Sequence, residues 1–222
     1  MKFISIFDVI GPNMIGPSSS HTAGAVSIAL LAKKLFSGKI VKAEFILYGS
    51  FAKTGSGHGT DKALLGGILG FDTSDGRIRD AFAIADERGI QYRFTQGEDD
   101  SVTHPNTADI FLEGENGERQ SIRGESVGGG KVRIVRINNI EVDFTGEYST
   151  LIVRQIDKPG VVSHITQCLS MHHANIAFMR LFRDDKGGIA YTVVESDDPI
   201  PNETLDEIRE NAGVQDIMLI QV

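Results

Sequence analysis

The chain has 222 residues, a formal net charge of -8, a hydrophobic content of 41% and one cysteine, Cys168. The acidity argues against a nucleic-acid partner, because phosphate contacts need clustered Lys and Arg. No apolar run approaches the roughly 20 residues of a membrane span, so no membrane partner is expected. Charged residues follow the N-terminus too closely for a signal peptide. One cysteine permits no internal disulfide, which favours a reducing, cytoplasmic compartment.

Helix-like and strand-like segments alternate up to residue 145. In chain order we expect strand 5–10, helix 25–36, strand 41–50, a helix from 60 or 61 to about 70, helix 78–88 capped by Asp75, and strand 90–95. Segment 51–59 is small, polar and glycine-rich, and no helix is predicted there. Two hairpins follow, which turn at Asn116-Gly117 and at Asn138-Asn139. The pattern predicts one α/β domain over 1–145 with a mixed or antiparallel sheet.

Residues 148–222 predict a second, smaller domain. We expect strand 151–156, a helix with Val161, Ile165 and Cys168 on one face, strands 176–182 and 189–194, helix 202–211 and strand 217–222. This order is βαββαβ, the ferredoxin-like plan, so the whole chain is expected to be α+β. The edge strands of such a domain pair readily, and we expect a homodimer through it.

A polar stretch from Gly16 to Gly24 precedes the first long helix. Five consecutive positions hold four hydroxyls and an imidazole, namely Ser18, Ser19, Ser20, His21 and Thr22. Serine oxygens cap the first free N–H groups of a helix, where the helix dipole also favours an anion. His21 can exchange a proton near neutral pH. The stretch predicts a site for a small carboxylate or phosphate, and an ordinary capped helix is the alternative.

Three segments resemble one protein family, in the same order along the chain. They are Gly16–Gly24, the stretch from Tyr48 to Asp61, and His104-Pro105-Asn106-Thr107. The first closely resembles the GPSSSHT signature of bacterial iron-sulfur-dependent L-serine dehydratases, and residues 1–145 are similar to the beta chain of the two-chain form. The resemblance implies a lyase that converts L-serine to pyruvate and ammonia. In that family a base removes the α-proton, and an iron of a 4Fe–4S cluster would assist departure of the hydroxyl.

The single cysteine bears on where that cluster is held. A 4Fe–4S cluster needs several thiolate ligands, which Cys168 cannot supply alone. In the resembling family a separate alpha chain carries those cysteines, so we expect an alpha-subunit partner and no metal within this chain. Cys168 and His172 are spaced like metal ligands on a helix, but both continue an apolar face and are expected in the core or at an interface.

The resemblance also suggests roles for individual residues. His58 lies among alternating glycines, which leave its imidazole exposed, and it is the candidate base or proton relay; a flexible surface loop is the alternative. The spacing of those glycines matches no nucleotide-binding loop. The hydroxyls of the 18–22 stretch would bind the carboxylate of L-serine or close the site against the alpha chain. Lys53 could hold the same carboxylate, although such lysines are more often solvated. His104, which precedes a proline in an extended or turn segment, is a candidate only through the resemblance.

A second resemblance covers residues 148–222. The run Asp157-Lys158-Pro159-Gly160-Val161, between a strand and a helix, looks like the start of an ACT domain, a regulatory module of many amino-acid enzymes. The resemblance implies a ligand loop at Asp157, Pro159, Gly160 and Val161, usually at an interface between two copies. Gly160 would let the backbone approach a bound amino acid. The sequence leaves open whether this loop binds an amino acid, a monovalent cation or no ligand.

Other functions also fit parts of the sequence. Residues 1–145 resemble the accessory substrate-binding domain of some 3-phosphoglycerate dehydrogenases, which implies a non-catalytic serine sensor in which His58 and His104 are dispensable for binding. A purely structural subunit that stabilises the alpha chain is a second alternative. A Ser–His hydrolase is disfavoured, because the chain has no Gly-x-Ser-x-Gly elbow.

Overall fold

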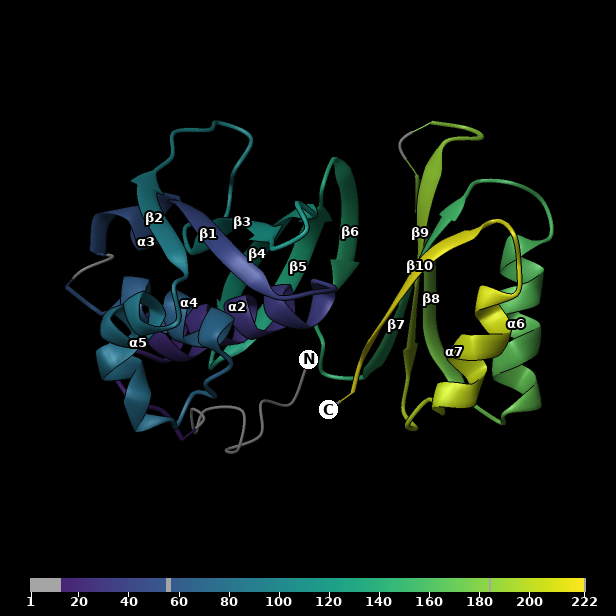
Figure 1. Ribbon diagram of the computed structural model, residues 1–222, viewed down its shortest axis with the longest axis horizontal. Helices are drawn as coiled ribbons and strands as arrows, with labels where there is room; N and C mark the ends of the chain where they lie inside the picture. The colour runs from purple at the N-terminus through teal and green to yellow at the C-terminus, as the bar shows by residue number, and fades with distance from the viewer. Residues whose placement is uncertain (1–12, 55–56, 184, 222) are drawn as a thin grey trace, which may run out of the picture. The chain divides into compact units, whose positions relative to one another are not determined.

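The computed structural model describes residues 13–54, 57–183 and 185–221, which fold into two compact units, Met1–Asn138 and Asn139–Val222. The two units are shown in Figure 1. The strand predicted over 5–10 lies outside the described residues. No helix of the described part of the chain is long and apolar enough to cross a membrane.

A mixed sheet forms the centre of the first unit. Its strands are β1 (Ile40–Leu47), β2 (Gln91–Gln96), β3 (Thr107–Gly114), β4 (Arg119–Gly128) and β5 (Lys131–Ile137), in the order β2-β1-β3-β4-β5. β1 pairs parallel with β2, and the other neighbours pair antiparallel. One face carries the apolar residues of the strands, including Ile110 and Ile122, which lie directly opposite each other and are buried. The predicted α/β organisation with a mixed sheet is confirmed.

Helices cover the apolar face of this sheet. They are η1, a π-helical turn (Ser19–Ala23), α2 (Gly24–Leu35), α3 (Gly49–Thr54), α4 (Thr60–Leu69), the 3₁₀ turn η2 (Gly76–Asp80) and α5 (Ala81–Glu87). α2 packs on β4 and β5 and against α4 (Figure 1). Its apolar residues recur every three or four positions, which places Ala25, Ile28 and Ala32 in the core.

Two details of the first unit differ from the sequence-based expectation. The helix expected over 78–88 is divided into η2 and α5, and Asp75 caps the 3₁₀ turn by accepting the Arg77 N–H at 2.9 Å. The glycine-rich composition of 51–59 did not indicate a helix, whereas α3 runs from Gly49 to Thr54. The carbonyl of Pro105 accepts the N–H groups of Ser50 and Phe51 at 2.6 and 3.3 Å, a contact from a distant segment that local composition does not reveal.

The second unit has the ferredoxin-like fold expected from its sequence. Its elements are β7 (Ser149–Ile156), α6 (Val161–Met171), β8 (Ile176–Arg183), β9 (Ile189–Ser196), α7 (Asn202–Arg209) and β10 (Val214–Ile220). The strand order is β10-β7-β9-β8, with every pair antiparallel. Cys168 lies in the hydrophobic core of this unit, together with Ile165 and Leu169.

The division between the units falls at Asn138-Asn139, just before β6 (Ile140–Phe144). Asn138 has φ +53°, which suits the tight turn predicted there. β6 contacts β8 and β9 and belongs to the second unit. The domain boundary expected from the sequence, between residues 145 and 148, stays a prediction.

Candidate functional site

The His21 imidazole is the centre of a hydroxyl cluster. Ser18 caps the π-helical turn by accepting the His21 N–H at 3.1 Å. The Nδ1 atom of His21 lies 3.1 Å from Ser20 Oγ and 3.3 Å from Ser18 Oγ, and its Nε2 atom lies 2.8 Å from Ser50 Oγ. Both ring nitrogens therefore have hydroxyl partners, which fixes the plane of the ring.

Ser50 connects the serine stretch to the turn at residues 104–107. Its side chain contacts His21, and its backbone N–H donates to the Pro105 carbonyl at 2.6 Å. The preceding residue, Gly49, has φ +52°, and a Cβ atom there would lie 2.7 Å from the Pro105 oxygen. Only glycine satisfies both the left-handed backbone and this close approach. Segments 16–24, 48–61 and 104–107 thus meet around one serine.

His58 lies beside His21. The two imidazoles pack edge to face with ring centroids 5.2 Å apart. The His58 carbonyl accepts a hydrogen bond from Thr22 Oγ1 at 3.4 Å, so the Thr22 hydroxyl is directed to backbone. The His58 side chain itself is exposed, as the glycines around it predict. The structure therefore brings His58 to the serine stretch, although 37 positions separate it from His21 in the sequence.

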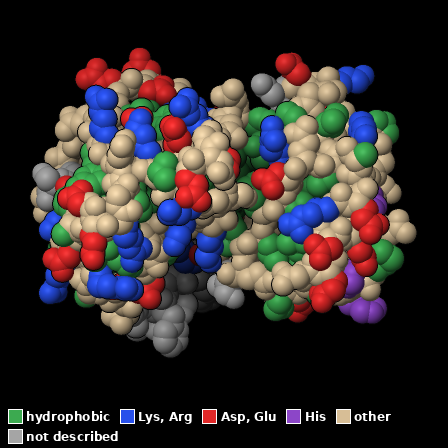
Figure 2. Space-filling view, in the orientation of Figure 1, with side chains coloured by type: hydrophobic (Ala, Val, Ile, Leu, Met, Phe, Trp, Pro, Cys, Tyr) green, Lys and Arg blue, Asp and Glu red, His purple; other side chains and the backbone are tan. Residues whose placement is uncertain are grey.

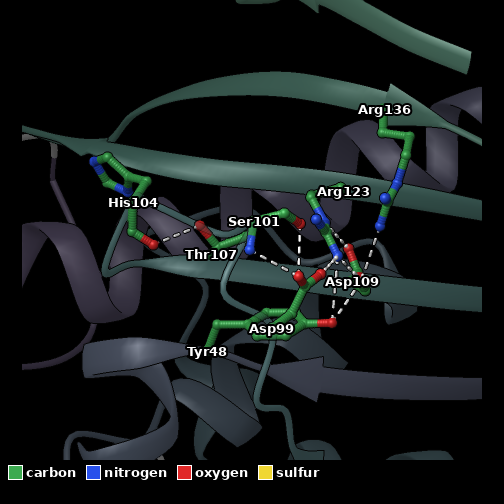
Figure 3. Close-up of polar contacts among 8 residues, drawn as sticks. All are labelled: Tyr48, Asp99, Ser101, His104, Thr107, Asp109, Arg123 and Arg136. Carbon is green, nitrogen blue, oxygen red and sulfur yellow. Dashed lines mark hydrogen bonds and ion pairs between the residues drawn. The ribbon is translucent and has the colours of Figure 1, made fainter.

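His104 and Lys53, the other two predicted site residues, lie outside the hydrogen-bonded His21 cluster that the structure describes. Nδ1 of His104 accepts the Asn106 N–H at 3.3 Å, and the His104 carbonyl accepts Thr107 Oγ1 at 2.8 Å. Figure 3 shows the His104 ring on the side of Thr107 that faces away from Arg123. Lys53, on α3, is exposed, and its ammonium has no hydrogen bond or ion pair with any described residue. Within the described part of the chain neither side chain hydrogen-bonds to the His21 cluster, so their roles stay predictions.

Burial lowers the pKa of His21 below its ordinary value of 6.5, and the neighbouring His58 lowers it further. His21 is thus neutral at pH 7 and able to accept a proton. We expect an NMR titration of the histidine ring protons of the full chain to give His21 a pKa below 6.5, with His21→Asn used to assign the signal. Because the folded chain binds fewer protons at this site than the unfolded chain, stability is complete above about pH 6.5 and declines as the pH falls through the folded pKa. A His21 pKa at or above 6.5 would contradict this environment.

Three buried oxygens belong to these segments or contact them. Among the described residues, Thr60 Oγ1, Asn106 Oδ1 and Ser126 Oγ are buried without a hydrogen-bond partner. Thr60 opens α4 just after His58, and the Ser126 N–H donates to the Asn106 carbonyl at 2.9 Å. Native proteins leave few buried polar groups unpaired, and a catalytic role is one of the reasons for such a group.

Some residues of the site have no distinct signal in the sequence. Ser50 was assigned no role, although it lies inside one of the three family-like segments. Tyr48, Asp109 and Arg123 were also not predicted, and they form a buried polar cluster close by in the sheet. The charged residues of β3 and β4 all stand at odd-numbered positions, on one face of the sheet, but this pattern alone does not show that two of them are paired and buried.

The predicted ligand loop of the second unit is only partly available for binding. Gly160 begins α6 with φ +92°, and the space beside its Cα is open. Pro159 is exposed, whereas the Val161 side chain is buried in the core. The Asp157 carboxylate accepts hydrogen bonds from Arg183 at 2.7 Å and from the Gly187 N–H at 3.2 Å, and both hold its pKa below the usual range. A ligand here would therefore contact the Pro159-Gly160 backbone.

The single thiol does not fit a 4Fe–4S cluster. Burial raises the pKa of Cys168, and its Sγ lies 3.6 Å from His164 Nε2. His172 pairs with Glu207 at 3.1 Å. Figure 2 shows histidine side chains at the helical edge of this unit. In the described part of the chain no group of three or more His, Cys, Asp or Glu is arranged to hold a metal ion. The placement of Cys168 in the core is confirmed.

Comparison with known proteins identifies the family. Residues 5–124 match the family model described as "Serine dehydratase beta chain", and residues 149–213 match the ACT domain. The chain belongs to the serine dehydratase beta chain family. It is 43% identical to the "Probable L-serine dehydratase, beta chain" of Bacillus subtilis (strain 168), over 94% of both chains. It is also 43% identical to the "L-serine dehydratase, beta chain" of Peptoniphilus asaccharolyticus, over 90% of both chains.

A more distant similarity extends to D-3-phosphoglycerate dehydrogenase. The enzyme of Synechocystis sp. (strain ATCC 27184 / PCC 6803 / Kazusa) is 26% identical over 89% of this chain, but the match covers 36% of that protein. The beta chains match at higher identity and over nearly their whole length, so the serine-sensor alternative is not favoured.

Proposed function

We propose that this chain is the beta chain of a two-chain L-serine dehydratase and forms part of its active site. The observation that carries the proposal is the meeting of His21, Ser50 and His58 from segments far apart in the sequence, in a chain of this family. The reaction converts L-serine to pyruvate and ammonia.

His58 is the residue proposed to take the α-proton, directly or as part of a relay. Its imidazole is exposed in this chain, so substrate and the partner chain can reach it. The His21 ring packs edge to face with it and is itself held by Ser50. Proton transfer by a positioned histidine contributes about 100- to 10,000-fold to the rate.

The serine stretch is proposed to hold the substrate carboxylate. The hydroxyls of Ser18, Ser19 and Ser20 lie within or next to the π-helical turn that leads into α2, where the positive end of the helix dipole favours an anion. Thr22 takes part through its bond to the His58 backbone. Lys53 and His104 are proposed as further contacts that form when the site is completed.

The 4Fe–4S cluster is proposed to belong to an alpha subunit, since the one thiol here is buried in the core of the second unit. When bound, the cluster supplies Lewis-acid chemistry at the substrate hydroxyl. This chain supplies the groups that bind the substrate and move its α-proton. A reducing, cytoplasmic location fits such a cluster and the absence of an internal disulfide.

The ACT domain is proposed to mediate a homodimer. β8 is an edge strand of its sheet, and Phe178 and Leu181 on it are 48% and 43% exposed. An exposed edge with large apolar side chains pairs readily with a second copy. The exposed Pro159-Gly160 turn is the proposed ligand contact.

The direct test is to co-express the chain with its alpha partner, purify the pair without oxygen, and measure pyruvate formed from L-serine. We expect the chains to purify together and to form pyruvate. If the isolated chain binds L-serine and purifies without a partner, the sensor alternative is correct. If the pair forms pyruvate but changes in the serine stretch alter neither kcat nor KM, the chain is a scaffold only.

A further inference from the structure

A buried ion pair lies across two central strands of the first unit. Asp109 of β3 and Arg123 of β4 are directly opposed in the sheet, and they are 4% and 9% exposed. Arg123 Nε donates to Asp109 Oδ1 at 2.6 Å, and Arg123 Nη2 donates to Oδ2 at 2.7 Å. This is the two-pronged geometry that fixes both side chains most firmly. Their neighbours in sequence, Ile110 and Ile122, face the helices, so the pair lies on the opposite face of the sheet.

Further groups extend this pair, as Figure 3 shows. Tyr48 Oη donates to Asp109 Oδ2 at 2.8 Å, and the Arg123 guanidinium lies 5.1 Å from the centre of the Tyr48 ring. Arg123 also reaches Asp99 at 3.3 Å, and Arg136 reaches Asp109 at 3.3 Å. Burial and the bond to Asp109 raise the pKa of Tyr48, so the phenol keeps its proton and continues to donate.

Each of these groups stands next to a segment of the candidate site. Tyr48 directly precedes Gly49 and Ser50, and Ser50 is the residue that contacts His21. Asp109 lies two positions after Thr107, whose hydroxyl donates to the His104 carbonyl. The Tyr48 N–H also donates to the Thr107 carbonyl at 3.0 Å. The polar cluster therefore joins the end of β1, where the 48–61 segment begins, to the start of β3, where the 104–107 segment ends.

Asp99 connects the cluster to the loop that leads to His104. Its carboxylate accepts hydrogen bonds from the Ser101 N–H and hydroxyl at 2.9 and 2.6 Å, which folds the loop into a turn. Arg123 binds the same carboxylate. A single guanidinium thus contacts the end of β1 through Tyr48, the start of β3 through Asp109, and the 97–106 loop through Asp99.

We propose that Arg123 is a positioning residue of the active site, which holds Ser50 and the 104–107 turn in register through Tyr48, Asp109 and Asp99. Its hydrogen bonds within the described part of the chain do not extend to His21 or His58, so its effect is transmitted through the backbone of these segments. The predicted effect on activity rests on the proposed function. The predicted effect on the geometry around His21 does not depend on it.

The test compares Arg123→Met, Arg123→Lys and a matched control, Arg119→Met. Arg119 lies four positions earlier on the same strand, and its side chain, which pairs with Glu113, is exposed. In the two-chain enzyme we expect Arg123→Met to lower kcat about 10- to 100-fold with little change in KM, because displaced catalytic groups lose rate steeply with distance. Arg123→Lys keeps the charge without the planar fork and should recover part of the rate. Arg119→Met should leave kcat unchanged.

A second measurement does not depend on activity. The His21 pKa of the full chain, measured by NMR, should move up toward 6.5 in Arg123→Met, because a displaced Ser50 would leave the His21 ring more hydrated. A purely structural role would lower stability and leave the pKa of the folded chain unchanged. If Arg123→Met does not fold, Tyr48→Phe keeps the ring and removes one hydrogen bond, and it should shift the His21 pKa in the same direction.

The outcomes separate this inference from the proposed function. The positioning role would be overturned if Arg123→Met had both the wild-type kcat and the wild-type His21 pKa. If only Tyr48→Phe folds, the same two results in that variant would overturn it. A shifted His21 pKa in a chain whose wild-type pair forms no pyruvate would support the positioning role and refute the dehydratase function.

Discussion

Replacement of His58 by alanine is expected to lower the kcat of the assembled two-chain enzyme by about 100- to 10,000-fold, the usual contribution of a positioned acid or base. Its side chain is exposed, so substrate can reach it, and its ring packs edge to face with that of His21. Thr22 binds the His58 carbonyl rather than its ring, so the backbone contact survives the change. The measurement is pyruvate formation without oxygen, with size-exclusion chromatography as the test of assembly.

The matched control for this experiment is His173→Asn. His173 is an exposed histidine of the second unit with φ +57°, a conformation that asparagine tolerates better than most residues. This variant should retain wild-type kcat. Near-wild-type activity in His58→Ala would show that another group, on this chain or on its partner, is the base.

The largest effect on stability is expected for Gly67→Ala. Gly67 of α4 faces α2, and a Cβ atom there would lie 2.5 Å from Ala29 Cβ, 2.6 Å from the Val26 carbonyl and 3.0 Å from the Leu30 nitrogen. Two of these three atoms belong to the backbone, so the helices must separate to relieve the contact. Overpacking of this kind costs about 1–3 kcal/mol in the free energy of unfolding.

Denaturant unfolding of the full chain, followed by circular dichroism, measures that cost. Gly76→Ala is the control, because no atom lies within 4 Å of the added methyl group and its φ is not in the left-handed region. Gly76→Ala should unfold at the wild-type midpoint or slightly above it. An unchanged midpoint in Gly67→Ala would mean that α2 and α4 do not pack as closely as described.

Local sequence patterns were sufficient to predict most of the fold. Apolar spacing indicated α2 and α6, alternation indicated the strands, and the Asn-Gly and Asn-Asn pairs indicated the turns. α3 was not predicted, because glycine-rich composition argued for a loop while the Pro105 carbonyl, more than fifty positions away, stabilises the helical turn. The division of helix 78–88 into η2 and α5 likewise has no separate signal in the hydrophobic pattern.

The candidate site was predictable in its parts but not in its connections. The hydroxyl-rich stretch and the glycines around His58 pointed to His21 and His58 from the sequence alone. Their contact, and the role of Ser50 in it, depend on tertiary packing of η1 against α4 and on the position of α3. The Asp109–Arg123 pair follows from strand register, which one sequence does not specify.

The central claim is that this chain completes an active site it cannot form alone. It is tested most directly by purifying the two chains separately without oxygen, mixing them, and following pyruvate formation from L-serine as this chain is titrated into a fixed amount of the alpha chain. We predict no activity from either chain alone, activity that rises to saturation on mixing, and no rise when the titrated chain carries His58→Ala. Full activity of the alpha chain by itself would contradict a shared active site.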